Sequence, residues 1–327
     1  MSELIRLDKL TRFFDMGRGK RVHAVDGVSF SIAEGETLGL VGESGSGKST
    51  LGKTLLGLYD KTAGSVMYKG EELPAHYRPR DFLRMANVMQ MIFQDPYASL
   101  NPRMTVGEII AEGLRLKPDM QAGDARARVT AALERVGLHA AHASRYPHEF
   151  SGGQRQRIGI ARALIMEPEF VVCDEPISAL DASVQAQVVN LLNDLKTSMG
   201  LTMLFIAHDL SMVRYISDRM AVMYLGSVME IGKATDVYFQ PRHPYTQILI
   251  ASNPEPDPGR EKQRLSTPIQ GEIPSPVNVP AGCRFASRCP QVMPVCREKT
   301  PQLLPLVNEE RLVACHLYTE PVTSAAS

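Results

Sequence analysis

The sequence has no excess of charge of either sign. Lysine and arginine number 36 together, and so do aspartate and glutamate, so the formal net charge is zero. A neutral chain has no broad field that would attract nucleic acid or an anionic membrane surface, and no local basic stripe stands out. We therefore expect no nucleic-acid partner. Hydrophobic residues make up 44% and charged residues 22%, the usual balance of a soluble protein with a core.

Long apolar runs are also absent. No uninterrupted run approaches the length that crosses a bilayer, and the N-terminal stretch MSELIRLDKLTRFF has neither an apolar signal region nor a cleavage site. The sequence thus predicts a cytosolic protein, whose membrane role would depend on a partner. The 327 residues suffice for one large domain or two of ordinary size.

Cysteines are few and unevenly placed. Four of the five lie near the C-terminus, at Cys283, Cys289, Cys296 and Cys315. In a reducing cytosol such a group does not form structural disulfides. Cys173 lies in an apolar run and is interpreted as a packing residue.

The first chemical motif is a phosphate-binding loop. GESGSGKST, from Gly42 to Thr50, fits G-x-x-x-x-G-K-[ST] between an apolar strand and a helix-like pattern. Its glycines let the backbone wrap around phosphates, and the helix adds its positive N-terminal end. Lys48 is expected to reach the β- and γ-phosphates, and the Ser49 hydroxyl to bind Mg²⁺. The remaining strands alternate with helices, which favours an α/β fold with a parallel sheet.

A second acidic site follows in FVVCDEP. Asp174 and Glu175 end an apolar strand, at the sheet edge that faces the phosphate loop. Asp174 could hold Mg²⁺, and Glu175 could act as general base on the attacking water. An acidic pair that caps a helix is the alternative.

Six motifs in order resemble the ATP-binding subunits of ABC transporters. They are the phosphate loop, Gln94, FSGGQRQR (150–157), Asp174–Glu175, SALD (178–181) and His208, and their order and spacing agree over residues 1 to about 250. The resemblance implies a P-loop NTPase domain of the ABC type, with an antiparallel β subdomain and a helical subdomain (about 97–165).

The resemblance also implies roles for individual residues. Gln94 senses Mg²⁺ and the γ-phosphate, His208 bonds the γ-phosphate, and both join Glu175 as catalytic residues. Phe14 stacks on adenine, with Phe13 as the substitute. The implied ATP-binding set is Phe14, Gly42, Ser44, Gly45, Gly47, Lys48, Ser49, Thr50, Gln94, Asp174 and His208, with Ser49, Gln94 and Asp174 around Mg²⁺. Taken singly, Phe14 could be a core residue, Gln94 part of a turn, and His208 a structural histidine.

The signature loop implies a dimer. Ser151, Gly152, Gly153 and Gln154 match the loop that contacts the γ-phosphate bound by the opposite subunit, and Asp181 matches the aspartate that bridges the two subunits. Phe150 stands where the family often has leucine. Because the loop acts on the opposite subunit, one copy of the chain cannot complete a site.

Three segments narrow the resemblance to the oligopeptide/dipeptide importers. These are MIFQDPYASLNPRMTVGEII (91–110), QPRHPYTQILIAS (240–252) and the cysteine-rich end. SGGQRQRIGIARAL matches the second of that group's two ATPase types, so the expected partner is a related, non-identical ATP-binding subunit. Two membrane permease subunits and an extracytoplasmic substrate-binding protein are implied, which places the chain at the cytoplasmic face of the inner membrane. Peptides are the expected cargo; nickel, glutathione, microcins and sugars are alternatives, as is an ABC ATPase without a transport role.

The domain prediction is an ATP-binding domain at 1–252, a Pro-rich linker at 253–282, a four-cysteine domain at 283–318 and a disordered tail at 319–327. The gaps between the four cysteines are five, six and eighteen residues, wider than zinc knuckles usually have. Four thiolates also suit a [4Fe–4S] cluster, which the family resemblance implies. Zinc, with His316 as a further candidate ligand, and no metal at all stay open.

Overall fold

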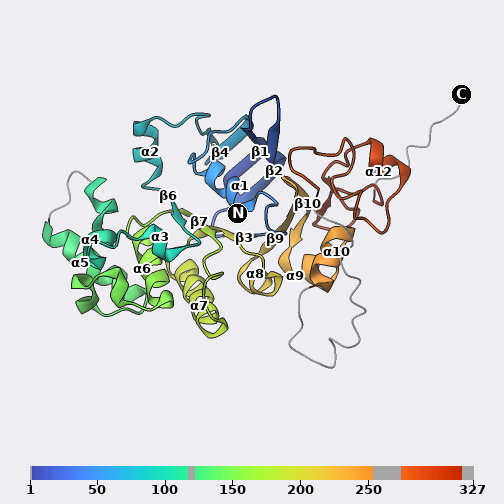
Figure 1. Ribbon diagram of the computed structural model, residues 1–327. Coiled ribbons are helices and arrows are strands. Elements are labelled where there is room, and N and C mark those ends of the chain that lie inside the picture. The colour runs from blue at the N-terminus through green and yellow to red at the C-terminus, as the bar shows by residue number, and fades with distance from the viewer. Residues whose placement is uncertain (1, 117–121, 253–273, 319–327) are drawn as a thin grey trace, which may run out of the picture.

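The computed structural model describes residues 2–116, 122–252 and 274–318. Figure 1 shows a helical part, a central part with the sheets, and a C-terminal segment on the far side of the sheets from the helical part. The predicted tail and most of the predicted linker (253–273) lie outside the described residues.

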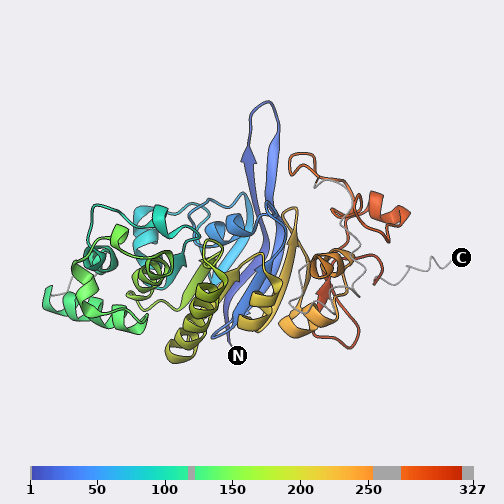
Figure 2. The same ribbon diagram turned by 60° about the horizontal axis from the view of Figure 1, so that its bottom comes forward.

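The small sheet is antiparallel, with the strand order β2-β1-β4-β5. Its strands are β1 (Glu3–Asp15), β2 (Arg21–Ala33), β4 (Ala63–Tyr68) and β5 (Glu71–Glu72). The antiparallel β subdomain that the resemblance implies is therefore confirmed, with β1 and β2 as its longest pair. Figure 2 shows the β1–β2 hairpin extending well beyond the rest of the molecule. The base of the hairpin is anchored, because Leu7, Leu10 and Val25 are buried in one cluster with Leu51 and Leu55 of the first helix.

The large sheet has eight strands among the described residues, in the order β11-β12-β10-β9-β3-β8-β7-β6. Its parallel centre consists of β3 (Thr37–Val41), β6 (Met89–Ile92), β7 (Phe170–Asp174), β8 (Thr202–Ile206) and β9 (Arg219–Tyr224). Every residue of β3, β7 and β8 is buried, as expected of parallel strands covered on both faces. The predicted parallel sheet is therefore confirmed, and its strands end at one edge with the phosphate loop and Asp174.

An antiparallel hairpin extends this sheet. β9 turns at Leu225 and Gly226 into β10 (Ser227–Lys233), and Gly226 has φ of 79°. Two short strands from the C-terminal segment, β11 (Leu304–Pro305) and β12 (Leu312–Val313), continue the sheet beyond β10.

Helices flank the large sheet. They are α1 (Lys48–Leu55), α2 (Pro79–Met85), α7 (Ala182–Met199), α8 (Leu210–Ile216), α9 (Ala234–Phe239) and α10 (Pro244–Ala251). Asp181 caps the start of α7, and Gly200, with φ of 65°, ends it. In the described ranges, no helix has both the length and the apolar content to span a membrane.

The predicted helical subdomain is confirmed as a block at one end of the large sheet (Figure 1). It contains α3 (Pro96–Ser99), α4 (Val106–Ala111), η1 (Gly113–Leu116), α5 (Ala122–Arg135), η2 (Ala140–Ser144), η3 (Pro147–Glu149) and α6 (Gly152–Leu164). Thr105 and Glu108 form a capping box at the start of α4, which satisfies two backbone N–H groups.

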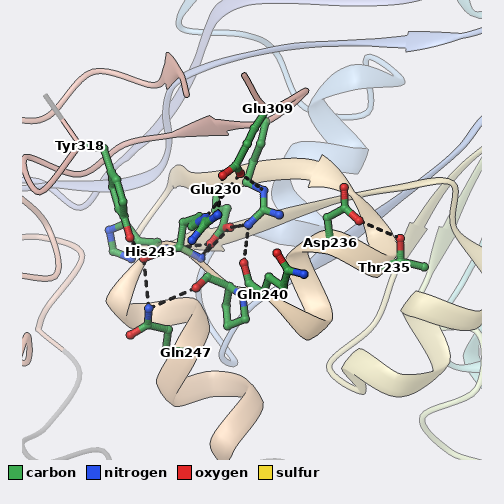
Figure 3. Close-up of polar contacts among 11 residues, drawn as sticks. Glu230, Thr235, Asp236, Gln240, His243, Gln247, Glu309 and Tyr318 are labelled. Atoms are coloured by element: carbon green, nitrogen blue, oxygen red, sulfur yellow. Dashed lines mark hydrogen bonds and ion pairs between the residues drawn. The ribbon is translucent and has the colours of Figure 1, made fainter. Parts of the chain in front are cut away.

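The C-terminal segment (residues 274–318, including α12, Pro294–Glu298) shares a hydrophobic core with the large sheet and α10. Cys283, Phe285 and Cys296 are buried in one cluster with Tyr224 and Tyr245. A charged network adds to this packing (Figure 3): Glu230, which is 0% exposed, accepts hydrogen bonds from the backbone N–H groups of Arg242 and His243 and from the Arg311 guanidinium. The segment is thereby fixed to β10 and to the turn before α10.

Candidate nucleotide site

The phosphate loop wraps closely because two of its glycines leave no room for a side chain. A Cβ on Gly42 would lie 2.1 Å from the Met223 carbonyl oxygen, and one on Gly47 would lie 1.9 Å from that of Ala24. Both have positive φ, 153° and 102°, which side chains rarely adopt. These contacts give the physical reason for the glycine spacing of the motif.

Lys48 is buried at the centre of the loop. Its Nζ donates to the carbonyl oxygens of Gly42 at 2.7 Å and Glu43 at 2.9 Å. Burial lowers the pKa of Lys48, while Glu175, Asp174 and Glu43 oppose this. Three nearby carboxylates thus favour the charged form that phosphate binding requires.

Ser49 and Asp174 meet although they lie on different elements. The Ser49 Oγ donates to the Asp174 Oδ1 at 2.6 Å, joining α1 to the end of β7. Burial raises the pKa of Asp174, opposed mainly by this hydrogen bond. A hydroxyl and a carboxylate are oxygen donors of the kind that Mg²⁺ prefers.

Glu175 has a strained backbone, with φ of 45°, an uncommon value for a residue with a side chain. Its Oε2 accepts a hydrogen bond from Gln94 Nε2 at 2.9 Å and lies 3.8 Å from His208 Nδ1. The structure therefore brings the three predicted catalytic residues together.

Lys48, Ser49, Gln94 and Glu175 line a cavity of about 410 Å³, whereas Gly42, Asp174 and His208 of the predicted ATP-binding set are not among its lining residues. It is lined by Phe14, Val22, Ala24, Ser44, Gly45, Gly47, Lys48, Ser49, Thr50, Gln94, Glu175 and Pro276. Phe14 makes an edge contact with Tyr59 and lies under the Arg12 guanidinium, 4.4 Å from its ring centre. Phe13 lies against His23 instead and is not among the lining residues.

The signature loop and Asp181 lie outside this cavity. Ser151 caps α6, with its Oγ accepting from the Gln154 N–H at 3.3 Å while Gln154 Oε1 accepts from the Ser151 N–H at 3.0 Å. A Cβ on Gly153 would lie 2.5 Å from Val184 Cγ1, so α6 and α7 approach closely there. Gly152 opens α6. Asp181 is exposed, and its pKa is lowered by hydrogen bonds from the Ser183 hydroxyl and the Val184 N–H.

The four C-terminal cysteines lie in one region and are free thiols. Burial, and then neighbouring cysteines, raises the pKa of Cys283 and Cys289, and raises that of Cys315 to about 11. The described residues nevertheless contain no group of three or more histidine, cysteine or acidic side chains arranged to hold a metal ion. His316 Nε2 bonds to the Lys299 carbonyl oxygen at 2.9 Å. Cys173 is buried in β7, in accord with its interpretation as a packing residue.

Two features near the cavity were not predicted from the sequence. Pro276 enters its lining from the C-terminal segment, and its carbonyl oxygen accepts from the His23 N–H at 2.9 Å. An apolar groove of about 350 Å³ lies between α2, β6 and η1, bordered by the exposed side chains Leu58, Phe82, Phe93 and Leu116. A run of consecutive apolar residues could have indicated the groove, but these four residues are far apart in the sequence.

Comparison with known proteins identifies the family. Residues 25–178 match the ABC transporter model, and residues 229–296 match the oligopeptide/dipeptide transporter C-terminal region. YkfD of Bacillus subtilis is 57% identical over 321 residues, covering 98% of this chain and 97% of that protein. The chain belongs to the ATP-binding subunits of this transporter family.

Two further relatives agree with this assignment. The oligopeptide transport ATP-binding protein OppF of Escherichia coli is 54% identical, covering 87% of this chain and 85% of OppF. A dimeric ATP-binding cassette in a post-hydrolysis state, bound to ADP and Pi, superposes with a TM-score of 0.65 at 28% identity, covering 71% of this chain and 99% of that one. The fold is thus that of an ABC ATPase, with its antiparallel sheet and helical part.

Proposed function

We propose that this chain is the ATP-hydrolysing subunit of an importer of di- and oligopeptides, acting at the cytoplasmic face of the inner membrane. The observation that carries the proposal is that Lys48, Ser49, Gln94 and Glu175 line one cavity. Ser49 is also hydrogen-bonded to Asp174, and Gln94 to Glu175. Peptide cargo rests on the relatives, because OppF carries oligopeptide transport in its name.

The chain's own residues suit the chemistry. Lys48 would exchange the carbonyl oxygens of Gly42 and Glu43 for the β- and γ-phosphates of ATP. Ser49, Asp174 and Gln94 would hold Mg²⁺, which would neutralise phosphate charge when bound. Glu175 would accept the proton of the attacking water while Gln94 and His208 keep its carboxylate aimed at the phosphate end of the cavity.

A second subunit would complete the site. Ser151, Gly152, Gly153 and Gln154 line no part of the cavity of their own chain. They open α6, where backbone N–H groups form an anion site. We infer that they act on ATP held by a non-identical partner subunit, with Asp181 at the contact between the two.

The apolar groove supports a membrane partner. Phe82 and Leu116 border it from α2 and η1, and Phe93 immediately precedes Gln94. Exposed apolar side chains around a groove are suited to contact with a protein partner. A partner in this groove would contact Phe93, the residue before Gln94, whose side chain is hydrogen-bonded to Glu175. We infer that a permease subunit docks in this groove. Two permease subunits and an extracytoplasmic substrate-binding protein would complete the importer.

For the cysteine-rich C-terminal extension, we propose that Cys283, Cys289, Cys296 and Cys315 hold a [4Fe–4S] cluster, with zinc as the alternative. Four free thiols in one region fit either group, since a bound metal would displace their protons, and burial raises the pKa of three of them, Cys283, Cys289 and Cys315. Such a group would supply folding energy to a segment with little apolar core of its own.

The experiment is affinity purification of the full chain from detergent-solubilised membranes. We expect one related ATP-binding subunit and two membrane proteins to be recovered with it, and peptides to stimulate ATP hydrolysis once the substrate-binding protein is added. Recovery of ribosomes or DNA without membrane proteins would contradict the transport proposal. Stimulation by nickel or sugars in place of peptides would contradict the cargo.

A further inference from the structure

The C-terminal segment reaches the phosphate loop through Arg288. Its guanidinium donates to both carboxylate oxygens of Glu43, at 2.8 Å and 3.1 Å, and to the Tyr224 hydroxyl at 3.2 Å. The Arg288 side chain is 5% exposed and that of Glu43 16%. Salt screens such a shielded pair only weakly, and losing one partner leaves a buried charge uncompensated.

Glu43 is held on its other sides as well. It is the second residue of the loop, and its N–H donates to the Tyr245 hydroxyl at 2.9 Å. Its carbonyl oxygen accepts from Lys48 Nζ at 2.9 Å and from the Ser46 N–H at 3.2 Å. The Glu43 carboxylate also acts electrostatically on Lys48. A change in the net charge at Glu43 therefore affects Lys48, the residue expected to bind phosphate.

We propose that Arg288 is a positioning residue for nucleotide binding, which neutralises Glu43 beside the phosphate loop and keeps Lys48 available for the phosphates. The inference rests on the proposed function, because it assumes that the loop binds ATP. Pro276 of the same segment lines the cavity, so the C-terminal segment reaches the nucleotide site at two points. Without Arg288, the unpaired carboxylate repels phosphate and competes for Lys48.

The test measures the affinity of the purified full chain for a fluorescent ATP analogue, displaced by ATP or ADP. Arg288→Met should raise the Kd for ATP about tenfold, the size expected of one uncompensated charge across a partly screened site, and raise that for ADP less because ADP carries less charge. Arg288→Lys should retain most of the affinity. Glu43→Gln should leave ATP binding unchanged or tighter, because Glu175 and Asp174 still favour the charged form of Lys48 while a negative charge beside the phosphates is removed. The double variant Arg288→Met/Glu43→Gln should recover most of the loss.

The opposite effects of Arg288→Met and Glu43→Gln on ATP affinity distinguish a positioning role of Arg288 from a purely structural one. A packing role for the pair would make Arg288→Met and Glu43→Gln weaken ATP binding alike, which would overturn the inference, as would an unchanged Kd in Arg288→Met. If Arg288→Met does not fold, the ATP affinities of Glu43→Gln and of the double variant decide. Weaker ATP binding by Glu43→Gln than by the wild type would then overturn the inference.

Two control variants complete the test. Arg297→Met removes an exposed arginine that adjoins Cys296 as Arg288 adjoins Cys289, and it should bind ATP like the wild type; an equal loss in Arg297→Met would overturn the inference. Lys48→Ala should abolish ATP binding. If Lys48→Ala still binds ATP, the proposed site itself fails, whereas loss in Lys48→Ala with no change in Arg288→Met refutes only the role of Arg288.

Discussion

Replacing His243 should remove an acid-sensitive part of the chain's stability. His243 precedes α10, and its Nδ1 accepts the Tyr245 N–H at 3.0 Å. The side chain lies near Phe285 in the core (Figure 3 shows its polar surroundings). Burial lowers the pKa of His243 from 6.5 to about 4. The folded state therefore resists protonation of this imidazole more than the unfolded state does.

The sign and size follow from linkage. Because the folded-state pKa is the lower one, the contribution to stability is fully present above pH 6.5 and declines as the pH falls toward 4. Between about pH 8 and about pH 5 the loss from this one group is about 2 kcal/mol. Glu230 acts in the opposite sense, because burial raises its pKa and its protonation favours the folded state. The contribution of His243 is therefore obtained from the difference between wild type and variant in the free energy of unfolding at each pH.

His243→Asn is the suitable variant, since asparagine can accept the same N–H at a helix start. The assay is urea unfolding of both proteins at several pH values. The free energy of unfolding of the wild type should fall by about 2 kcal/mol more than that of the variant over this range. His139 accepts a similar N–H bond at an exposed position, so His139→Asn should keep the wild-type pH dependence. Parallel pH curves for wild type and His243→Asn would show that the burial of His243 does not make the stability of the chain depend on pH.

Three further outcomes are expected. Arg311→Met leaves the fully buried Glu230 without its cation and should lower the free energy of unfolding by about 3–5 kcal/mol. Lys233→Met breaks an exposed pair with Glu310 and should lower it by less than about 1 kcal/mol. Equal losses in the two variants would contradict the importance of burial for the Arg311–Glu230 pair. Cys289→Ser should lower the iron and sulfide content of anaerobically purified protein, or its zinc content, while Cys173→Ala should not; a metal-free, folded wild type would refute both metal proposals. Phe82→Asp in the apolar groove should sharply reduce recovery of the membrane proteins, whereas Asp at the exposed Val307 should not; equal recovery from both variants would remove the groove as the docking site.

Features encoded by neighbouring residues were predictable from the sequence. The turn at Gly226 and the end of α7 at Gly200 are local backbone requirements for positive φ. The apolar run before Asp174 indicated a buried strand, and it is fully buried as β7. The spacing of the phosphate loop likewise reflects close backbone contacts at its glycines.

Contacts between distant residues were not predictable. Arg288 and Glu43 lie 245 positions apart, and no periodicity links an arginine beside a cysteine to a loop glutamate. The entry of Pro276 into the cavity depends on how the C-terminal segment packs against β2. Nothing in the propensity of the residues around Glu175 indicates its positive φ of 45°. The shared core around Phe285 is hidden in a stretch that the composition marks as poor in apolar residues.

We propose that Glu175 activates water at an ATP site that a second subunit completes. The most direct test is a dimer that carries Glu175→Gln, with the corresponding base of the partner subunit also replaced. We predict that it binds ATP and stays closed, with ATP retained through gel filtration and no phosphate released. Phosphate release at the wild-type rate by this doubly substituted dimer would contradict the claim.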